Sequence, residues 1–497
     1  SPWPWVGCIG YGVVMNSPPA LIRAQFDSLC GDDQFALFVS MRAEMEKMRA
    51  EIQSLRDQVA KNSRNSGKPP SSDGFTKPRP KSLRAKGKRK SGGQPGHVGK
   101  TLERVATPDH VVRHPLVSCP ICASGLTDSP SYGIETRQVF DLPPMKFEVT
   151  EHQAAVKFCR GCAVRVKGAF PLAVTQPTQY GSRVKSLAVY LSNYQFLPLA
   201  RLRELFSDLY GHAPSESWIV SASKEMVDEI APSLEAIREQ LVASPVLHSD
   251  ETGLRVEGRL NWLHSAGTER LTFYAVHPKR GWDAMHETGI LPRFQGRAVH
   301  DAFASYFKFD QCSHALCNAH HLRELKFVED EYEQAWASEM TYLLLEIKDE
   351  VGASPPELAS LPQERLAHYE RRYDTLLQRG FDANPPPTES LPETRGRKKQ
   401  SPPKNLLDRL SKRRGETLVF MRDFRVPFDN NLAERDVRMM KVKQKISGTF
   451  RTRAGAETFC AIRTYISTAR KQGQRVLNAI HDAFLANPFI PAAHGAE

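Results

Sequence analysis

The sequence predicts a multidomain α/β protein, because of its length and the order of the elements in its central part. At 497 residues the chain is long enough for several domains. Extended runs rich in β-branched residues predict three antiparallel strands, at 246–256, 261–266 and 271–277. The following patterns predict helix, strand, helix, strand and helix, at 282–291, 297–301, around 305–307, 314–317 and from about 319. This is the element order of the ribonuclease H fold.

Two carboxylates lie on strands that the ribonuclease H fold makes neighbours in this predicted sheet. Asp250 lies inside the first strand, where an acid is unfavourable unless a positive charge compensates it. Its neighbour Glu251 must face the other side of the sheet, because successive strand side chains alternate. Asp301 ends the fourth strand, which the ribonuclease H fold places beside the first. We therefore take Asp250 and Asp301 as the functional pair, with a metal ion as the expected counter-charge.

A third carboxylate, Glu434, follows a predicted helix cap at Asp429 and Asn430. The blocks HSDET, VHDAFASYF, HALCNAHHLREL and FDNNLAERDVRMMKVKQKISGTFRT resemble those of the insertion-sequence-66 family of bacterial transposases. NSRNSGKPPSSDG, GGQPGH, an N-terminal heptad helix and paired CxxC segments resemble the same family, so the resemblance spans nearly the whole chain. It implies a ribonuclease-H-like core whose Asp, Asp, Glu triad is Asp250, Asp301 and Glu434.

Such a triad predicts two Mg²⁺ (or Mn²⁺) ions about 3.5–4 Å apart, with Asp250 between them and Asp301 and Glu434 each favouring one. With water as nucleophile the enzyme would cut a strand at the element end. With a freed 3′-hydroxyl it would join that end to target DNA. Two alternatives remain at this stage: a ribonuclease-H-like nuclease that only hydrolyses, and a non-catalytic zinc-dependent DNA-binding regulator.

The charge distribution predicts DNA as a partner. Lys and Arg exceed Asp and Glu by 68 to 56, for a formal net charge of +12. Nine basic residues and no acid lie between Thr76 and Lys100, and a second basic run covers 395–399. Both runs lie in polar or Pro-rich linkers that can follow phosphates. The predicted contacts in the first linker are Lys86, Lys88, Arg89 and Lys90.

The remaining composition bears on location. A run of about 18 apolar residues is absent, so we expect no membrane partner. The start of the chain lacks the basic n-region of a secretory signal, and we expect it to precede a natural start at Met15. Nine cysteines, four of them in CxxC pairs, suit a reducing cytoplasm. The resemblance implies that this cytoplasm is bacterial and that the protein is associated with the nucleoid.

A heptad pattern predicts a coiled-coil helix over residues 31–61. Its apolar seam alternates in steps of four and three through Met41, Met45, Met48, Ile52, Leu55 and Val59. The prediction is a homodimer or higher oligomer, with accessory proteins of the same element as further possible partners. The alternative is a single amphipathic helix packed on its own domain.

Two CxxC pairs predict structural zinc in a module over residues 105–176. Their thiols, from Cys119, Cys122, Cys159 and Cys162, suit tetrahedral Zn²⁺, although 36 residues separate the pairs. The main alternative is a redox dithiol. We expect strands at 136–142 and 147–158, and basic side chains presented to DNA by Lys157, Arg160, Arg165 and Lys167.

Helical patterns flank the predicted core. Residues 177–243 predict either a helix-turn-helix reader of DNA or a packing subdomain. A helical insertion with a Pro-rich basic linker separates Asp301 from Glu434. The complete division is an N-terminal extension (1–30), coiled-coil helix (31–61), basic linker (62–104), zinc module (105–176), helical subdomain (177–243), core (244–328 and 425–485), insertion (329–424) and tail (486–497).

Residues at the entrance of the insertion allow two further interpretations. A second zinc site among Cys312, His314, Cys317, His320 and His321 is disfavoured, because a strand-to-helix junction holds them too tightly. His320 and Arg323 match the family's block, so either side chain could approach the scissile phosphate, with helix packing as the alternative.

The helix that carries Glu434 predicts a basic track. Ala433, Val437 and Met440 form an apolar stripe, and Glu434, Arg438 and Lys441 share the adjacent face at the same spacing. We therefore expect these two cations to contact phosphates near the site. The track is expected to continue through Lys443, Lys445, Arg451 and Arg453.

Overall fold

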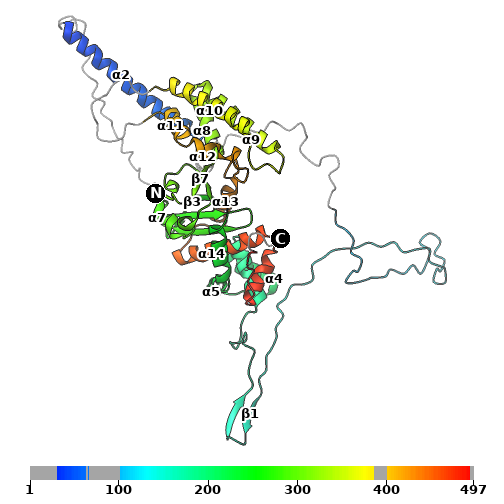
Figure 1. Ribbon diagram of the computed structural model, residues 1–497. Coiled ribbons are helices and arrows are strands. Elements are labelled where there is room, and N and C mark those ends of the chain that lie inside the picture. Colours follow the sequence, from blue (N-terminus) through cyan, green and yellow to red (C-terminus); the bar gives the residue numbers. More distant parts are fainter. Residues whose placement is uncertain (1–30, 63–64, 67–100, 386–399, 493–497) are drawn as a thin grey trace, which may run out of the picture. The chain divides into compact units, whose positions relative to one another are not determined.

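The computed structural model describes residues 31–62, 65–66, 101–385 and 400–492 (Figure 1). Contacts divide the chain into a core unit, residues 77–317 and 416–497, and a helical unit, residues 1–76 and 318–415. The predicted DNA contacts at Lys86, Lys88, Arg89 and Lys90 lie outside the described residues, as do the N-terminal extension, most of the first basic linker and the basic run at 395–399. In the described part, no helix is both long and apolar enough to span a membrane.

The core unit is built on a five-stranded mixed sheet in the order β5-β4-β3-β6-β7. β3 (Val246–Val256), β4 (Arg259–Gly267) and β5 (Thr272–His277) form the predicted antiparallel meander, and β6 (Arg297–His300) and β7 (Ser313–Leu316) run parallel to β3. Glu257 and Gly258 join β3 to β4 with φ of 53° and 75°, so the tight hairpin turn requires left-handed backbone at both positions. The five predicted strands are confirmed.

Two predicted helices beside the sheet are shorter than expected. α7 covers only Trp282–Glu287, because Gly289 adopts a φ of 70° and ends the helix, and a 3-10 turn (Leu291–Arg293) follows. The helix predicted around 305–307 is a single 3-10 turn, Tyr306–Lys308. The Tyr306 side chain of this turn is buried in the apolar cluster on one face of the sheet.

Each face of the sheet has its own apolar cover. On one face, Leu247 and Ala298 pack with Ile237 of α6 (Ala231–Val242), Met285 of α7 and Tyr306. On the other, Val299 packs with Val419 and Val426, and Leu254 and Leu263 pack with Met440 of α13 (Asn431–Ser447) and Phe459 of α14 (Arg453–Lys471). The alternation along β3 therefore decides which side chains face α13.

The predicted helical subdomain shares its core with the C-terminal helices. It contains α3 (Ser182–Val189), a π-helical turn (Tyr190–Tyr194), α4 (Leu199–Tyr210), α5 (Glu216–Glu229) and α6. Val189 and Met226 are buried against Ile466 of α14 and Ile480 of α15 (Val476–Phe484). Residues 177–243 are therefore one packed body with the C-terminal helices.

α14 also protects the edge of the sheet. The backbone N–H groups of Thr272 and Tyr274 on β5 donate to the hydroxyls of Thr468 and Thr464, at 3.1 and 2.9 Å. A helix thus satisfies backbone groups that an edge strand otherwise leaves open to association.

The helical unit contains α2 (Gly31–Ala60), α8 (Asn318–Tyr332), α9 (Ala335–Ala353), α10 (Gln363–Ala383), α11 (Pro402–Lys412) and the start of α12 (Arg414–Leu418). The sequence placed its boundary after residue 328, whereas α8 falls inside this unit. Asp57 of α2 accepts a hydrogen bond from Tyr332 of α8 at 2.7 Å. The predicted seam residues from Met41 to Leu55 remain about half exposed.

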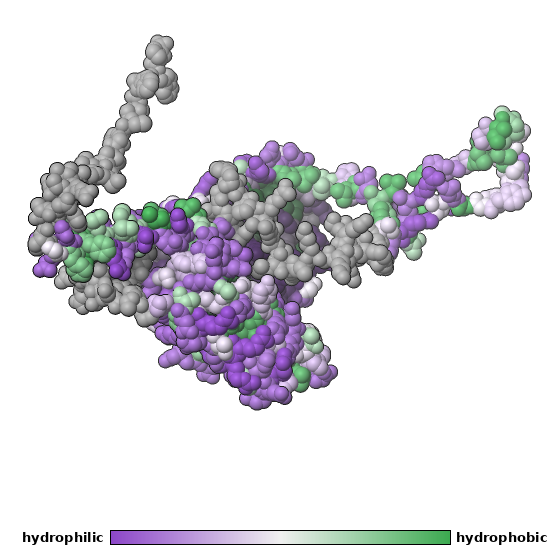
Figure 2. Space-filling view, turned by 90° about the horizontal axis from the view of Figure 1, so that it is seen from above, coloured by the Kyte–Doolittle hydropathy of each residue, from purple (hydrophilic) through white to green (hydrophobic). Residues whose placement is uncertain are grey.

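The CxxC segment has little regular structure. β1 (Val156–Cys159) and β2 (Val164–Lys167) form an antiparallel hairpin. The strand predicted at 136–142 is absent from the described residues, and the one predicted at 147–158 begins only at Val156. Figure 2 shows apolar side chains exposed along an extended segment of the chain. In the CxxC segment, Ile121 and Tyr132 are almost fully exposed. Because this segment lacks an apolar core, we expect a bound ligand such as a metal ion to stabilise its structure.

Candidate active site

The parallel register of β3 and β6 places the two predicted aspartates side by side. His248 is aligned with Val299, and Asp250 and Asp301 each follow two residues later. Strand alternation puts Asp250 on the face covered by α13, and Asp301 directly follows the last residue of β6. Burial raises the pKa of Asp250 well above its usual value, and the negative charges of Glu251, Asp301 and Glu434 raise it further. The structure thus brings the three predicted acids into one electrostatic cluster.

Asp301 is held at the carboxyl end of β6. Its Oδ1 accepts a hydrogen bond from the backbone N–H of Phe303 at 2.9 Å. Its Oδ2 lies 3.8 Å from the guanidinium of Arg280, and 29% of its side chain remains exposed. A loop that turns immediately after the strand therefore fixes the carboxylate while leaving it accessible.

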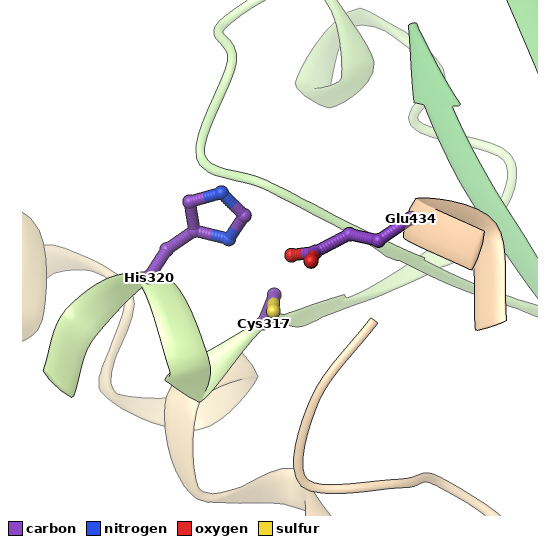
Figure 3. A group of neighbouring side chains, drawn as sticks. All are labelled: Cys317, His320 and Glu434. Atoms are coloured by element: carbon purple, nitrogen blue, oxygen red, sulfur yellow. The ribbon is translucent and has the colours of Figure 1, made fainter. Parts of the chain in front are cut away.

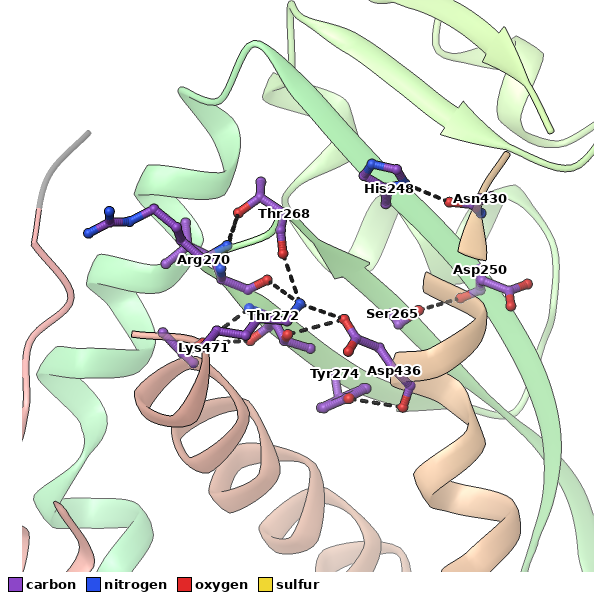
Figure 4. A network of polar contacts seen from close by, with 12 residues as sticks. His248, Asp250, Ser265, Thr268, Arg270, Thr272, Tyr274, Asn430, Asp436 and Lys471 are labelled. Atoms are coloured by element: carbon purple, nitrogen blue, oxygen red, sulfur yellow. Dashed lines mark hydrogen bonds and ion pairs between the residues drawn. The ribbon is translucent and has the colours of Figure 1, made fainter. Parts of the chain in front are cut away.

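Asn430 fixes the helix that carries Glu434. Its Oδ1 accepts from His248 Nδ1 and its Nδ2 donates to the Ser249 carbonyl, both at 2.8 Å (Figure 4). Its backbone N–H donates to Cys317 Sγ at 3.1 Å. The residue is only 2% exposed, so these contacts tie the start of α13 to β3 and to the end of β7.

The predicted cap of α13 is correct in position and different in chemistry. Asn430 is the N-cap, and its carbonyl accepts from Glu434 N–H at 3.1 Å, but its side chain caps nothing. The carboxylate of Asp429 accepts from Asn431 N–H instead, at 3.2 Å. Glu434 is therefore in the first turn of the helix, where the helix dipole favours a carboxylate.

Cys317 is a neighbour of Glu434 that the sequence reasoning did not assign to the site. Its Sγ and a Glu434 carboxylate oxygen lie within 4.8 Å of each other, and the thiol is buried (Figure 3). The family-like block around CNAHH was the available signal. His320, also labelled there, and Arg323 belong to α8 of the helical unit, where Arg323 Nε donates to the Ala319 carbonyl at 3.3 Å.

The other residues once considered for a second zinc have separate contacts. Cys312 is buried in the apolar cluster below the sheet and donates to the Phe309 carbonyl. His314 Nδ1 lies 3.0 Å from His300 Nε2. His321 bonds the side chain of Asn318 at 3.1 Å, inside the helical unit.

Glu251 faces away from Asp250, as strand alternation predicted. Its carboxylate is almost completely buried, where it accepts from Arg280 Nε at 2.7 Å and from the Tyr306 hydroxyl at 2.6 Å. From the sequence alone, no role is predicted for Glu251 beyond facing the other side of the sheet. In the structure its buried carboxylate pairs with Arg280, and the signal that could have indicated this is this Arg, three residues after the third strand.

The predicted basic track divides into exposed and internal side chains. Arg438 and Lys445 are exposed on α13, whereas Lys441 Nζ donates to the Gly253 carbonyl at 2.9 Å. Lys443 is buried, donates to the Gly448 carbonyl and lies 3.8 Å from the Phe450 ring, and burial lowers its pKa to about 8. The expected common direction of Glu434, Arg438 and Lys441 is therefore wrong, because the Lys441 side chain points to β3.

The last two members of the predicted track lie just beyond α13. Arg451 is exposed, and Arg453 pairs with Glu457 at 2.8 Å on the surface of α14. Exposed side chains of this kind remain available to a polyanion.

The two CxxC turns have matching geometry. In each, the residue after the second cysteine adopts left-handed backbone, with φ of 59° at Ala123 and 52° at Ala163. The Ser124 hydroxyl and backbone, with the Cys119 thiol, lower the pKa of Cys122 to about 7. Hydrogen bonds from Cys162 and Gly161 likewise lower the pKa of Cys159. No three of the four thiols lie within 4.8 Å of one another. Each turn thus offers two sulfur ligands, and a pair of such turns fits Zn²⁺.

Three family models match parts of the chain. The model of the Transposase IS66 family matches residues 177–458, more than half of the chain and all three carboxylates. The zinc-finger binding domain of transposase IS66 matches residues 117–163, which include the four cysteines. A family of unknown function matches residues 17–103. No curated protein matches the chain.

Proposed function

The chain belongs to the IS66 family of transposases, and we propose that it binds the ends of an insertion sequence, cleaves the DNA strand and joins the 3′-hydroxyl to target DNA. A transposase with a zinc-finger domain has DNA as its partner. The strand order β5-β4-β3-β6-β7, with β3 parallel to β6 and β7, supports a ribonuclease-H-like core. The finer proposal is the chemistry at Asp250, Asp301 and Glu434.

The observation that carries this proposal is the cluster of carboxylates around Asp250, which includes Asp301 and Glu434. Burial and mutual repulsion raise the pKa of Asp250, so the cluster is incomplete without further positive charge. Oxygen ligands of this type suit Mg²⁺ or Mn²⁺, and we assign two such ions to Asp250, Asp301 and Glu434. When bound, the ions would make the nucleophile more acidic and stabilise the leaving oxygen.

The protein's own contribution is to hold the three ligands in place. The Phe303 N–H orients Asp301, and the Asn430 contacts fix the first turn of α13 and so Glu434. Asp250 Oδ1 accepts from the Glu251 N–H at 2.9 Å. Preorganised ligands avoid reorganisation during the reaction.

Conservative substitutions test the triad. We expect Asp250→Asn, Asp301→Asn and Glu434→Gln each to abolish cleavage and joining of labelled element ends in Mg²⁺, with DNA binding nearly unchanged, because shape is kept and charge is lost. Glu269→Gln, at an exposed carboxylate of the same unit, is the matched control and should remain active. A residue whose substitution leaves joining at the wild-type level does not belong to the triad.

The same assay separates the alternatives. A nuclease that only hydrolyses would cut the ends and never join them to a plasmid. A non-catalytic regulator would bind the ends, and the three substitutions would change nothing measurable. Joining by the wild-type protein excludes both.

We further propose that α2 mediates self-association through its apolar seam. In the described part of the chain, the seam residues from Met41 to Leu55 are about half exposed and Val59 is 87% exposed, which leaves them available to a second copy. Light scattering should show a smaller particle when Met45 and Leu55 are both replaced by Glu. An unchanged mass would place the interface elsewhere.

A further inference from the structure

A fourth carboxylate and a cation lie directly beside the proposed triad. Glu251 is next to Asp250 in sequence, and its side chain is 1% exposed, against 38% for its partner Arg280. Arg280 Nε and Nη2 both approach Glu251 Oε1 at 2.7 Å. The remaining oxygen, Oε2, accepts the Tyr306 hydroxyl at 2.6 Å. The carboxylate of Glu251 is therefore fully occupied by protein donors.

This pairing makes Glu251 unavailable as a metal ligand, unlike the three acids of the proposed triad. A buried carboxylate needs a charged or hydrogen-bonding partner, and Arg280 and Tyr306 supply both to Glu251. The pair is neutral as a whole. It therefore adds no net charge to the three acids of the triad, which still need positive charge from metal ions.

Aromatic rings fix the guanidinium from other directions. The Arg280 guanidinium carbon lies 4.2 Å from the ring centre of Phe303 and 5.0 Å from that of Trp262. Such cation–π contacts, together with charge-assisted hydrogen bonds to Glu251, leave the guanidinium little freedom. Its position is therefore set by β3, β4 and the loop after β6.

The fixed guanidinium also reaches the triad. Arg280 Nη2 lies 3.8 Å from Asp301 Oδ2, while Phe303 donates its backbone N–H to Asp301 Oδ1. Phe303 thus contacts both groups, by its backbone to Asp301 and by its ring to Arg280. The Asp301 carboxylate is consequently approached at both oxygens by groups whose own positions are fixed.

We propose that Arg280, anchored by Glu251, is a positioning residue that holds the Asp301 carboxylate in its metal-binding orientation. The proposal rests on the proposed function, since it requires Asp301 to be a metal ligand. Groups that orient a metal ligand typically change metal affinity by about 10–100-fold when they are removed. A purely electrostatic role predicts unchanged metal affinity, because loss of the neutral pair leaves the local net charge unchanged.

The test is Mn²⁺ binding by the full-length protein, followed by the loss of the free-ion electron paramagnetic resonance signal. Replacing both partners, Glu251→Gln with Arg280→Gln, avoids an uncompensated buried charge and keeps the net charge. We expect the Mn²⁺ affinity of this variant to fall at least about tenfold. Arg280→Lys keeps the cation but loses the planar fork, and we expect a similar fall.

Wild-type Mn²⁺ affinity in the double variant would overturn the proposal, leaving the pair a purely structural role. If the double variant does not fold, Arg280→Lys decides the matter, and wild-type affinity there would equally overturn positioning by the fork. Asp301→Asn measured in parallel keeps the two proposals apart. Unchanged Mn²⁺ binding in Asp301→Asn would instead refute Asp301 as a metal ligand, and with it that part of the proposed function.

Discussion

Breaking the ion pair between Lys471 and Asp436 should strongly destabilise the packing of α13, the helix that carries Glu434. Lys471 Nζ donates to Asp436 Oδ2 at 2.8 Å and to the carbonyls of Thr268 and Leu271 at 2.8 and 3.1 Å (Figure 4). Thr272 also donates to Asp436, at 3.2 Å. All three ammonium donors are therefore used, and they tie α13 and α14 to the turn between β4 and β5.

Lys471→Met should remove this connection and strongly lower the free energy of unfolding. Breaking a buried pair by removing one partner typically costs about 3–5 kcal/mol. The side chains of Lys471 and Asp436 are 18% and 16% exposed, so we expect a loss of stability at the lower end of this range. A loss of about 3 kcal/mol corresponds to a fall in Tm of roughly 6–12 °C for a domain of about 200 residues.

Thermal unfolding by calorimetry measures this effect. Glu457→Gln is the control, because its pair with Arg453 is more than half exposed and should contribute less than about 1 kcal/mol. Adding Asp436→Leu to Lys471→Met should restore much of the stability, since no buried charge is then left unpaired. A fall in Tm for Lys471→Met no larger than that of the control would refute the reasoning.

Three further predictions concern zinc, DNA and pH. Removal of zinc by a chelator, or Cys119→Ser, should unfold the CxxC module and abolish specific end binding, and elemental analysis should find about one zinc per chain; full end binding by metal-free protein would contradict this. Replacing Arg438 and Lys445 by Ala should flatten the slope of log affinity against log salt by nearly one unit per contact, unlike Arg371→Ala on α10, and an unchanged slope would place the DNA elsewhere. Lys443→Met should raise the free energy of unfolding by up to about 3 kcal/mol at pH 7, because the folded-state pKa of about 8 lies below the unfolded value. Wild-type stability attributable to Lys443 should therefore increase between pH 8 and about 10.5, so the advantage of the variant should vanish there in urea titrations; a pH-independent difference would refute the assigned pKa.

The sequence by itself determined the local features of the site. Alternation along β3 put Asp250 and Glu251 on opposite faces, and the order of strands put Asp301 beside Asp250. The spacing of Ala433, Val437 and Met440 selected the buried side of α13, and these residues are at most 8% exposed. Such features follow from periods of 2 and 3.6 residues, which any single segment carries in its own sequence.

Only the tertiary structure decided which distant groups meet. Asn430 reads locally as a helix cap, yet its side chain bonds β3, 181 and 182 residues away. Lys443 reads as part of a basic surface, yet it is buried beside Phe450. Periodicity tells which side of an element is apolar, but the partner that covers it depends on how the chain returns from far away. The polar contacts that fix the helix carrying Glu434 are therefore set by packing and not by local sequence.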